Sequence, residues 1–308
     1  MTHPNRRTYL AVDAGGTKAE FLLADDVSEL ARVRVGSIKV LTTPAAEAEK
    51  NFAAALRELE RSSAINAREL TRTCIGASGY SVPSVQEWLR MQHRRWAGGE
   101  LLLCGDEEIA LDAAFEGGRG VLALAGTGSN VVGRTADGKR VRAGGWGPVL
   151  GDEGSGHWIG LEAVRGLFHA IDERKVTRLE EAVLEAWRLS SREALVERGS
   201  LAELKEFAAL TPVVVRCAAE GDRVAAEVLR SAGRELARLV TLVIREMEEL
   251  EPGSALPKVA LAGGILGSVD AVRTAMAAEL RAAWPEVVVA RDAVDPVLGA
   301  LWRARKAR

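Results

Sequence analysis

Short apolar runs alternate with amphipathic stretches along the chain, and this alternation predicts two successive groups of strands and helices. In the first group we expect strands over 9–12, 19–23, 29–35, 72–77 and 101–104, and helices over 44–61, 83–98 and 107–115. In the second group we expect strands over 121–125, 129–134, 140–143, 259–262 and 287–290. Helices there should fill most of 155–250, with breaks near 211–212 and 221–222, and then 271–283 and 296–304. Such an alternation is typical of an α/β protein.

The two groups repeat one plan, in which a strand, a turn containing glycine and threonine, two further strands, a helix and a strand follow one another. We therefore predict an internal duplication with its boundary near 117–120, and a ligand site in a cleft between the two halves. The expected domains are residues 1–117, residues 118–295 with a helical insertion, and a terminal helix within 296–308 that packs back on the first domain.

Composition and charge narrow the class of partner. The chain has 308 residues, 47% apolar and 27% charged, with a formal net charge of −2. A balanced charge gives no field that would attract nucleic acid, and no apolar run approaches the ~20 residues of a membrane helix. The isolated cysteines Cys74, Cys104 and Cys217 suggest neither a disulfide framework nor a zinc site. We expect a cytoplasmic protein without nucleic-acid or membrane partners.

Two glycine-containing turns follow the first strand of each group. The turn at 13–18 reads Asp-Ala-Gly-Gly-Thr-Lys, and the turn at 125–130 reads Ala-Gly-Thr-Gly-Ser-Asn. Glycines let backbone N–H groups approach phosphate oxygens, Thr17 adds a hydroxyl donor, and Asp13 can hold Mg²⁺. Either turn alone could be an ordinary hairpin. Their matching positions in duplicated units favour two turns that face one polyphosphate.

A carboxylate follows the strand at 101–104. Asp106 begins a helix, so its side chain could simply satisfy free N–H groups as an N-cap. It could also be a general base that takes the proton of a hydroxyl attacking a phosphoryl group. The residue type fits both interpretations.

Two further glycine-rich segments suit a bound ligand. The segment 144–156 has six glycines in thirteen residues, with Trp146 as an apolar wall, Asp152 as an acceptor for sugar hydroxyls and Ser155 as a helix cap. The strand at 259–262 runs into Gly263 and Gly264, where a nucleoside could lie on bare backbone. A flexible linker and an ordinary strand–helix turn are the alternatives.

Taken together, these residues resemble the sugar kinase/Hsp70/actin ATPase superfamily. Within it, Gly-Thr-Gly-Ser-Asn at 126–130, followed by Gly-Gly-Trp-Gly-x-x-x-Gly-Asp-Glu-Gly-Ser at 144–155, is similar to the N-acetylglucosamine kinase branch of the BadF/BadG-type ATPase family. The resemblance implies two duplicated ribonuclease H-like domains, the actin-like ATPase fold, with a cleft between them. It also implies an ATP- and Mg²⁺-dependent kinase that phosphorylates the 6-hydroxyl of an amino sugar, with N-acetylglucosamine as the first candidate.

The resemblance implies a role for each matched position. Asp106 would be the base on the sugar 6-hydroxyl, and Asp13 would lie near Mg²⁺. The residues that would line the amino-sugar pocket are Ser78, Gly79, Thr127, Gly145, Trp146 and Asp152. The residues that would hold ATP are Gly15, Gly16, Thr17, Lys18, Gly126, Gly128, Gly263 and Gly264. A homodimer formed through the helical second domain, and closure of the domains over the sugar, are implied as well.

One position departs from the family pattern. Where such kinases often carry a sugar-holding Asn after the third strand, this chain reads Gly-Ser-Ile-Lys at 36–39. Lys39 is either a solvated loop lysine or a substrate-binding residue that pairs with a carboxylate, such as the lactyl group of N-acetylmuramic acid. N-acetylmuramic acid, glucosamine and other hexosamines therefore remain alternative acceptors.

Three other classes compete with the kinase. An activator-type ATPase of a dehydratase or reductase system would need cysteines bridging an iron–sulfur cluster. A sugar-responsive repressor would need a DNA-binding module before the first strand, where the chain has about eight residues. A non-catalytic sugar-binding relative would be expected to lack Asp13 or Asp106, and both are present.

Overall fold

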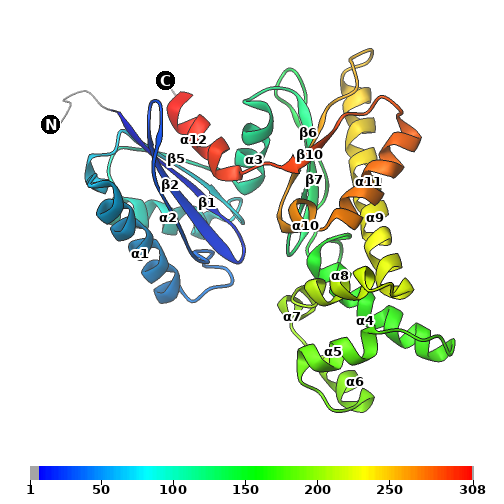
Figure 1. Ribbon diagram of the computed structural model, residues 1–308. Coiled ribbons are helices and arrows are strands. Elements are labelled where there is room, and N and C mark those ends of the chain that lie inside the picture. The colour runs from blue at the N-terminus through cyan, green and yellow to red at the C-terminus, as the bar shows by residue number, and fades with distance from the viewer. Residues whose placement is uncertain (1–6, 307–308) are drawn as a thin grey trace. The chain divides into compact units, whose positions relative to one another are not determined.

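The computed structural model describes residues 7–306, which divide into two compact units (Figure 1). The first unit contains the chain up to Gly118 and again from Val294 onward, and the second is Arg119–Ala293. The chain thus passes from one unit to the other twice. None of the helices in the described part of the chain combines the length and the apolar character needed to cross a membrane.

The first unit is built on a five-stranded sheet. Its strands are β1 (Thr8–Ala14), β2 (Lys18–Asp25), β3 (Glu29–Gly36), β4 (Arg72–Ala77) and β5 (Glu100–Gly105), in the order β3-β2-β1-β4-β5. β1, β2 and β3 pair antiparallel as a meander, whereas β1, β4 and β5 are parallel. β1 is apolar on both faces because helices cover both sides of it.

Different helices cover the two faces of this sheet. On one face, α1 (Ala45–Ser63), the short η1 (Ala67–Glu69) and α2 (Pro83–Trp96) pack on Leu10, Val12 and Phe21. On the other face, α3 (Asp106–Phe115) and α12 (Pro296–Lys306) pack on Tyr9 and Ala11. The final helix of the chain therefore belongs to the core of the first unit.

The second unit repeats the sheet. Its strands are β6 (Gly120–Ala125), β7 (Ser129–Arg134), β8 (Arg140–Gly144), β9 (Val259–Ala262) and β10 (Val289–Ala293), in the order β10-β9-β6-β7-β8. The first strand again lies at the centre, with two antiparallel strands on one side and two parallel strands on the other. This shared topology confirms the predicted α/β class and the duplication.

Helices make up most of the rest of the second unit. The longest, α9 (Arg223–Leu250), begins where the Asp222 carboxylate accepts the N–H of Ala225 at 2.9 Å. Gly233 lets α9 approach α11 (Asp270–Ala283) closely, because a Cβ there would lie 2.5 Å from the Val272 carbonyl oxygen. The other helices are α4 (Gly156–Asp172), α5 (Leu179–Trp187), α6 (Arg192–Leu201), α7 (Leu204–Ala208), α8 (Thr211–Ala219) and α10 (Gly264–Ser268).

The structure differs from the predicted elements at one strand and agrees with them at two helix breaks. The predicted helix breaks at 211–212 and 221–222 are confirmed, since α8 starts at Thr211 and α9 follows Asp222. The predicted strand at 287–290 is shifted, because β10 starts at Val289. The N–H of Val287 donates to the Trp284 carbonyl in a turn, so this residue cannot begin the ladder.

Candidate functional site

The carboxyl ends of three parallel strands, β1, β4 and β5, lie at one edge of the first sheet. The predicted site residues that follow these strands are Gly15, Ser78 and Asp106. In the strand register Ala14 pairs with Ala77, and Ala77 pairs with Gly105. The residues that follow therefore emerge together, and the N–H of Ser78 donates to the Ala14 carbonyl at 3.0 Å. Polar groups at the carboxyl ends of parallel strands commonly form ligand sites in α/β proteins.

Asp106 is the first residue of α3 and is partly buried at this edge. Gly105 occupies the N-cap position, so the interpretation of Asp106 as the cap itself is wrong; its carboxylate accepts the N–H of Glu107 at 3.1 Å. Burial, followed by the negative charge of Glu107, raises the pKa of Asp106, while the charge of Lys39 acts in the opposite direction. A partly buried carboxylate with a raised pKa at the end of a parallel strand suits proton transfer.

Asp13 lies near the end of β1 and is a second carboxyl group with a raised pKa at this edge. Burial raises the pKa of Asp13 to about 7, with further contributions from the charges of Asp106, Glu20 and Asp295. Lys18 partly offsets them. The carboxylate form of Asp13 is therefore costly in the chain alone and would be favoured by a nearby cation.

Glu20 and its partners were missed by the sequence analysis. Glu20 pairs with Asp13 in the register of β1 and β2 and is buried. Arg32 and Arg34 on β3 hold its carboxylate at 3.0 and 2.9 Å, and Arg32 also contacts Asp295 at 2.7 Å. The only sequence signal was an acidic residue inside an otherwise apolar strand.

The Asp13 region fits Mg²⁺ bound together with phosphate. Among residues 7–306, no group of three or more His, Cys, Asp or Glu side chains is arranged to hold a metal without other ligands. Mg²⁺ usually takes one or two protein carboxylates and completes its shell with substrate phosphates and water. A single, electrostatically strained carboxylate such as Asp13 matches that demand.

The turn after β1 leaves room for a ligand at its backbone. Thr17 and Lys18 are exposed, and a Cβ placed on Gly16 would meet nothing within 4 Å. Packing within the chain therefore does not explain why glycine stands at 16. The empty space beside the backbone suits phosphate oxygens approaching the N–H groups.

Lys39 lies beside the Ser78–Gly79 turn. Gly79 has φ +80°, and a Cβ there would lie 3.8 Å from Cε of Lys39. The Lys39 carbonyl accepts the N–H groups of Thr42 and Thr43 at 3.0 and 2.9 Å, which closes a turn around it. Partial burial and the electrostatic effect on Asp106 place this ammonium group at the same sheet edge as the candidate base.

In the second unit, the first residues of α4 donate backbone hydrogen bonds to the turn at 126–128. The Gly126 carbonyl accepts the N–H of Gly156 at 2.8 Å, and the Thr127 carbonyl accepts that of His157 at 3.3 Å. Ser155 caps this helix as predicted, since its hydroxyl accepts the N–H of Trp158 at 3.2 Å. The turn therefore has a rigid support, while the Thr127 side chain is exposed.

Gly263 and Gly264 lie against the same turn. Gly263 has φ +86°, and a Cβ there would be 2.3 Å from the Ala125 carbonyl oxygen, so only glycine fits. Gly264 is exposed at the start of α10, and a Cβ on it would meet nothing within 4 Å. The end of β9 and the end of β6 thus bring the 126–128 turn and the two glycines together.

Asp152 joins the 126–128 turn to the glycine-rich loop. It is buried with φ +61°, and its carboxylate accepts the backbone N–H groups of Ser129 and Gly147. A Cβ on Gly128 would lie 2.6 Å from its Oδ2 atom. Burial is the largest effect on Asp152 and raises its pKa, against those two hydrogen bonds.

Trp146 projects from the same loop and is 71% exposed. The guanidinium of Arg142 lies 5.6 Å from the centroid of its ring and donates to the Gly145 carbonyl at 2.6 Å. Nearby Val149 and Leu150 are also largely exposed. Arg142 could not be predicted from the sequence, since nothing in a strand of alternating residues marks one arginine as a support for the loop.

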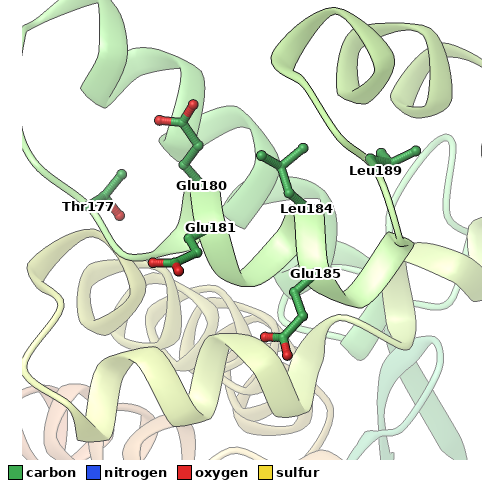
Figure 2. Close-up of a pocket in the computed structure, with 6 residues that line it drawn as sticks. All are labelled: Thr177, Glu180, Glu181, Leu184, Glu185 and Leu189. Atoms are coloured by element: carbon green, nitrogen blue, oxygen red, sulfur yellow. The ribbon is translucent and has the colours of Figure 1, made fainter.

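A concave surface elsewhere on the second unit does not match this chemistry. Figure 2 shows the side chains that line it, on and beside α5: Thr177, Glu180, Glu181, Leu184, Glu185 and Leu189. None of them is a predicted site residue, and Glu180 is already paired with Arg192. Three carboxylates would repel a nucleotide, so this surface is no candidate for the ATP site.

Comparison with known sequences identifies relatives over the whole chain. A sequence profile described as the BadF/BadG/BcrA/BcrD ATPase family matches residues 10–304. An N-acetylmuramic acid/N-acetylglucosamine kinase from Clostridium acetobutylicum is 28% identical over 302 residues, which cover 96% of this chain and 97% of that protein. An N-acetyl-D-glucosamine kinase from Dictyostelium discoideum is 29% identical over 200 residues, 63% of this chain and 62% of the relative.

Comparison with solved structures supports the same fold. A crystal structure assigned as an N-acetylglucosamine kinase from Chromobacterium violaceum superposes with a TM-score of 0.72 and 28% identity, covering 96% of this chain and 98% of that one. This likeness confirms the predicted actin-like fold of two duplicated domains. The family match confirms the resemblance to the BadF/BadG-type ATPase family that was based on the glycine-rich motifs.

Proposed function

The chain belongs to the BadF/BadG/BcrA/BcrD ATPase family, and we propose that this amino sugar kinase transfers the γ-phosphoryl group of ATP to the 6-hydroxyl of an N-acetylated hexosamine. N-acetylglucosamine is the proposed principal acceptor, and N-acetylmuramic acid is the main alternative. The observation that carries the proposal is the meeting of Asp13 and Asp106 at one edge of the first sheet.

Asp106 is the proposed general base. As the sugar O6 attacks the γ-phosphorus, the O6–H proton passes to the Asp106 carboxylate, the O6–P bond forms and the bond to the ADP oxygen breaks. The raised pKa of Asp106 supports this role because it increases the proton affinity of the carboxylate. The remaining catalysis is positioning and neutralisation of phosphate charge.

The proposed ATP site uses the glycines around the two turns. Gly15, Gly16, Thr17 and Lys18 would contact phosphates, as would Gly126 and Gly128, while Gly263 and Gly264 would lie by the nucleoside. The empty space beside Gly16, Gly126 and Gly264 supports this assignment. Asp13 would hold Mg²⁺, which supplies positive charge to the transferring phosphoryl group.

The proposed sugar contacts are those that the sequence resemblance implies. Ser78, Gly79, Thr127, Gly145, Trp146 and Asp152 are the proposed contacts. Lys39 is the proposed partner for a substrate carboxylate, supported by its place beside Gly79 and its electrostatic effect on Asp106. A lysine at this position favours acceptance of N-acetylmuramic acid in addition to N-acetylglucosamine.

The activator-type ATPase remains the alternative function. It would need cysteines that can reach a shared iron–sulfur cluster, whereas Cys74, Cys104 and Cys217 are all buried in strands or helices. The kinase is therefore the better supported proposal. A homodimer and a cytoplasmic location accompany it as predictions of the sequence.

A coupled assay of ADP release tests the function. Purified protein is given ATP, Mg²⁺ and, in turn, glucose, glucosamine, N-acetylglucosamine, N-acetylmannosamine and N-acetylmuramic acid. We expect turnover with N-acetylglucosamine that exceeds the turnover with glucose and the basal ATP hydrolysis. Basal hydrolysis unaffected by any sugar would contradict the kinase and favour the activator alternative.

A further inference from the structure

The first turn of α3, where the proposed base lies, is held by a side chain that the mechanism does not use. Oε1 of Glu108 accepts the backbone N–H of Gly105 at 3.2 Å. This hydrogen bond spans the junction of β5 and α3, and Asp106 lies inside the loop it closes. Gly105 has no side chain that restricts its backbone dihedral angles. The hydrogen bond from Gly105 to Glu108 therefore limits the orientations that the next residue, Asp106, can adopt.

Glu108 is in turn held by the last helix of the chain. Its Oε2 atom lies 3.3 Å from a terminal guanidinium nitrogen of Arg303 on α12. The Nε–H of the same arginine donates to the Asp112 carboxylate, one helical turn further along α3. Asp112 is only 1% exposed, so this ion pair compensates a buried carboxylate. Arg303 thus bridges two carboxylates of the helix that begins with the proposed base.

The two helices cannot slide apart easily around this bridge. Gly299 on α12 packs so closely on α3 that a Cβ there would lie 1.8 Å from the Ile109 carbonyl oxygen. Around Gly299 on α12, Val297, Ala300 and Leu301 belong to the same apolar cluster as Ile109. The guanidinium therefore has a defined position relative to the start of α3.

We propose that Glu108 and Arg303 are positioning residues that hold the Asp106 carboxylate in its reactive orientation. The inference rests on the proposed role of Asp106 as general base. Displacement of a catalytic group by about 1 Å can cost on the order of 100-fold in rate. In this proposal Arg303 holds Glu108, and Glu108 holds the backbone of Gly105 next to Asp106. Neither side chain has to touch the reacting atoms.

The simpler view is that Glu108 only stabilises the helix, as acidic residues at this position often do. Three variants separate the two views. Glu108→Ala removes the acceptor for Gly105, whereas Glu108→Gln keeps an acceptor of the same shape and loses the charge. Arg305→Met is the matched control, since Arg305 anchors the same helix through the Asp25 carbonyl instead of through α3.

For Glu108→Ala we expect a fall in kcat of about tenfold, with the KM values for ATP and sugar changed less than about twofold. In Glu108→Gln, kcat should stay close to the wild-type value, because the amide oxygen still accepts the N–H of Gly105. Arg305→Met should lower thermal stability without lowering kcat. If Glu108→Ala leaves kcat unchanged, or if Arg305→Met lowers kcat as much, the positioning role is wrong.

Arg303 is tested together with its buried partner Asp112, because Arg303→Met alone would remove the ion pair of a buried carboxylate and could unfold the protein. The double variant Arg303→Met/Asp112→Asn avoids this. It should lower kcat several-fold while KM stays within about twofold of the wild-type value. Unchanged kcat in a folded double variant would exclude Arg303 from the positioning role.

A measurement that does not depend on catalysis separates failure of this inference from failure of the proposed function. Amide hydrogen exchange at Gly105 should be accelerated at least about tenfold by Glu108→Ala and little by Arg305→Met. Unaltered exchange would show that Glu108 does not hold this turn. If exchange responds but Asp106→Asn keeps full activity, the proposed base is wrong, and the positioning role falls with it.

Discussion

Asp13 on β1 and Glu20 on β2 lie opposite each other in an antiparallel pair, so two carboxylates share the end of the first sheet. Glu20 is charge-paired with Arg32 and Arg34, whereas Asp13 has Lys18 as its offsetting charge. The pair is therefore asymmetric: Glu20 has two arginine partners, and the Asp13 carboxylate remains available to a cation.

Asp13→Asn should make the protein more stable at neutral and alkaline pH. The folded chain has the pKa of Asp13 near 7, above its ordinary value of 3.8, so the folded state binds this proton more tightly than the unfolded state. Wild-type stability should thus decrease as the pH rises from about 4 to about 7, and the variant lacks this loss. We expect the variant to be stabilised by a few kcal/mol at pH 8 and by almost nothing at pH 4.

Thermal unfolding without Mg²⁺ at the two pH values checks this prediction. The exposed Asp292, changed to Asn, serves as the control for loss of one negative charge. A gain in stability that is equal at both pH values would contradict the raised pKa of Asp13.

Binding of the Mg²⁺–ATP complex should strengthen as the pH rises through 7. The proton on Asp13 competes with the metal, so the KM for Mg²⁺–ATP should fall about tenfold between pH 6 and pH 8. Initial rates at saturating sugar measure it. In Asp13→Asn the KM should be high and almost independent of pH, and a wild-type pH dependence that persists in this variant would assign it to another group.

Asp106→Asn should lower kcat by roughly 10²–10⁴-fold and leave sugar binding nearly intact. The amide keeps the size of the side chain but cannot accept the proton of the sugar hydroxyl. Steady-state kinetics and calorimetric sugar titration separate the two effects. Asp292→Asn, at an exposed aspartate outside the site, is the control. Turnover that survives in Asp106→Asn would refute the assignment.

Lys39→Ala should affect acceptors according to their charge. If Lys39 pairs with a carboxylate, kcat/KM for N-acetylmuramic acid should fall about 10-fold to 100-fold, and that for N-acetylglucosamine much less. Lys50→Ala, which removes an exposed lysine from α1, is the control for general charge effects. An equal fall in kcat/KM for both sugars would show that Lys39 does not bind the carboxylate.

The sequence was sufficient for the fold because each apolar run is short, is bounded by glycine, proline or aspartate, and recurs in the same order. The glycine turns could be found for a related reason, since the backbone demands them locally, as Gly263 shows by its contact with Ala125. Most of α5 to α7 could not be separated, because their boundaries depend on tertiary packing.

The supporting residues could not be predicted, because they act across long separations. Arg32 meets Asp295, and Arg303 meets Glu108, only after α12 has packed on the first sheet. No local pattern distinguishes these arginines from others on exposed helix and strand faces. The candidate base and metal ligand could thus be found from sequence, but the charges that tune and orient them needed the structure.

The two backbone hydrogen bonds that Asp152 accepts limit the positions at which substrate preference can change in this chain. Because one carboxylate secures both Ser129 and Gly147, a replacement there would disturb the strand after the 126–128 turn and the glycine-rich loop at once. New acceptor preferences should therefore arise by drift at the exposed positions of the loop, Trp146, Val149 and Leu150, which no such dual bond constrains. Relatives with different sugar preferences should vary at these three positions while retaining an acidic residue at 152.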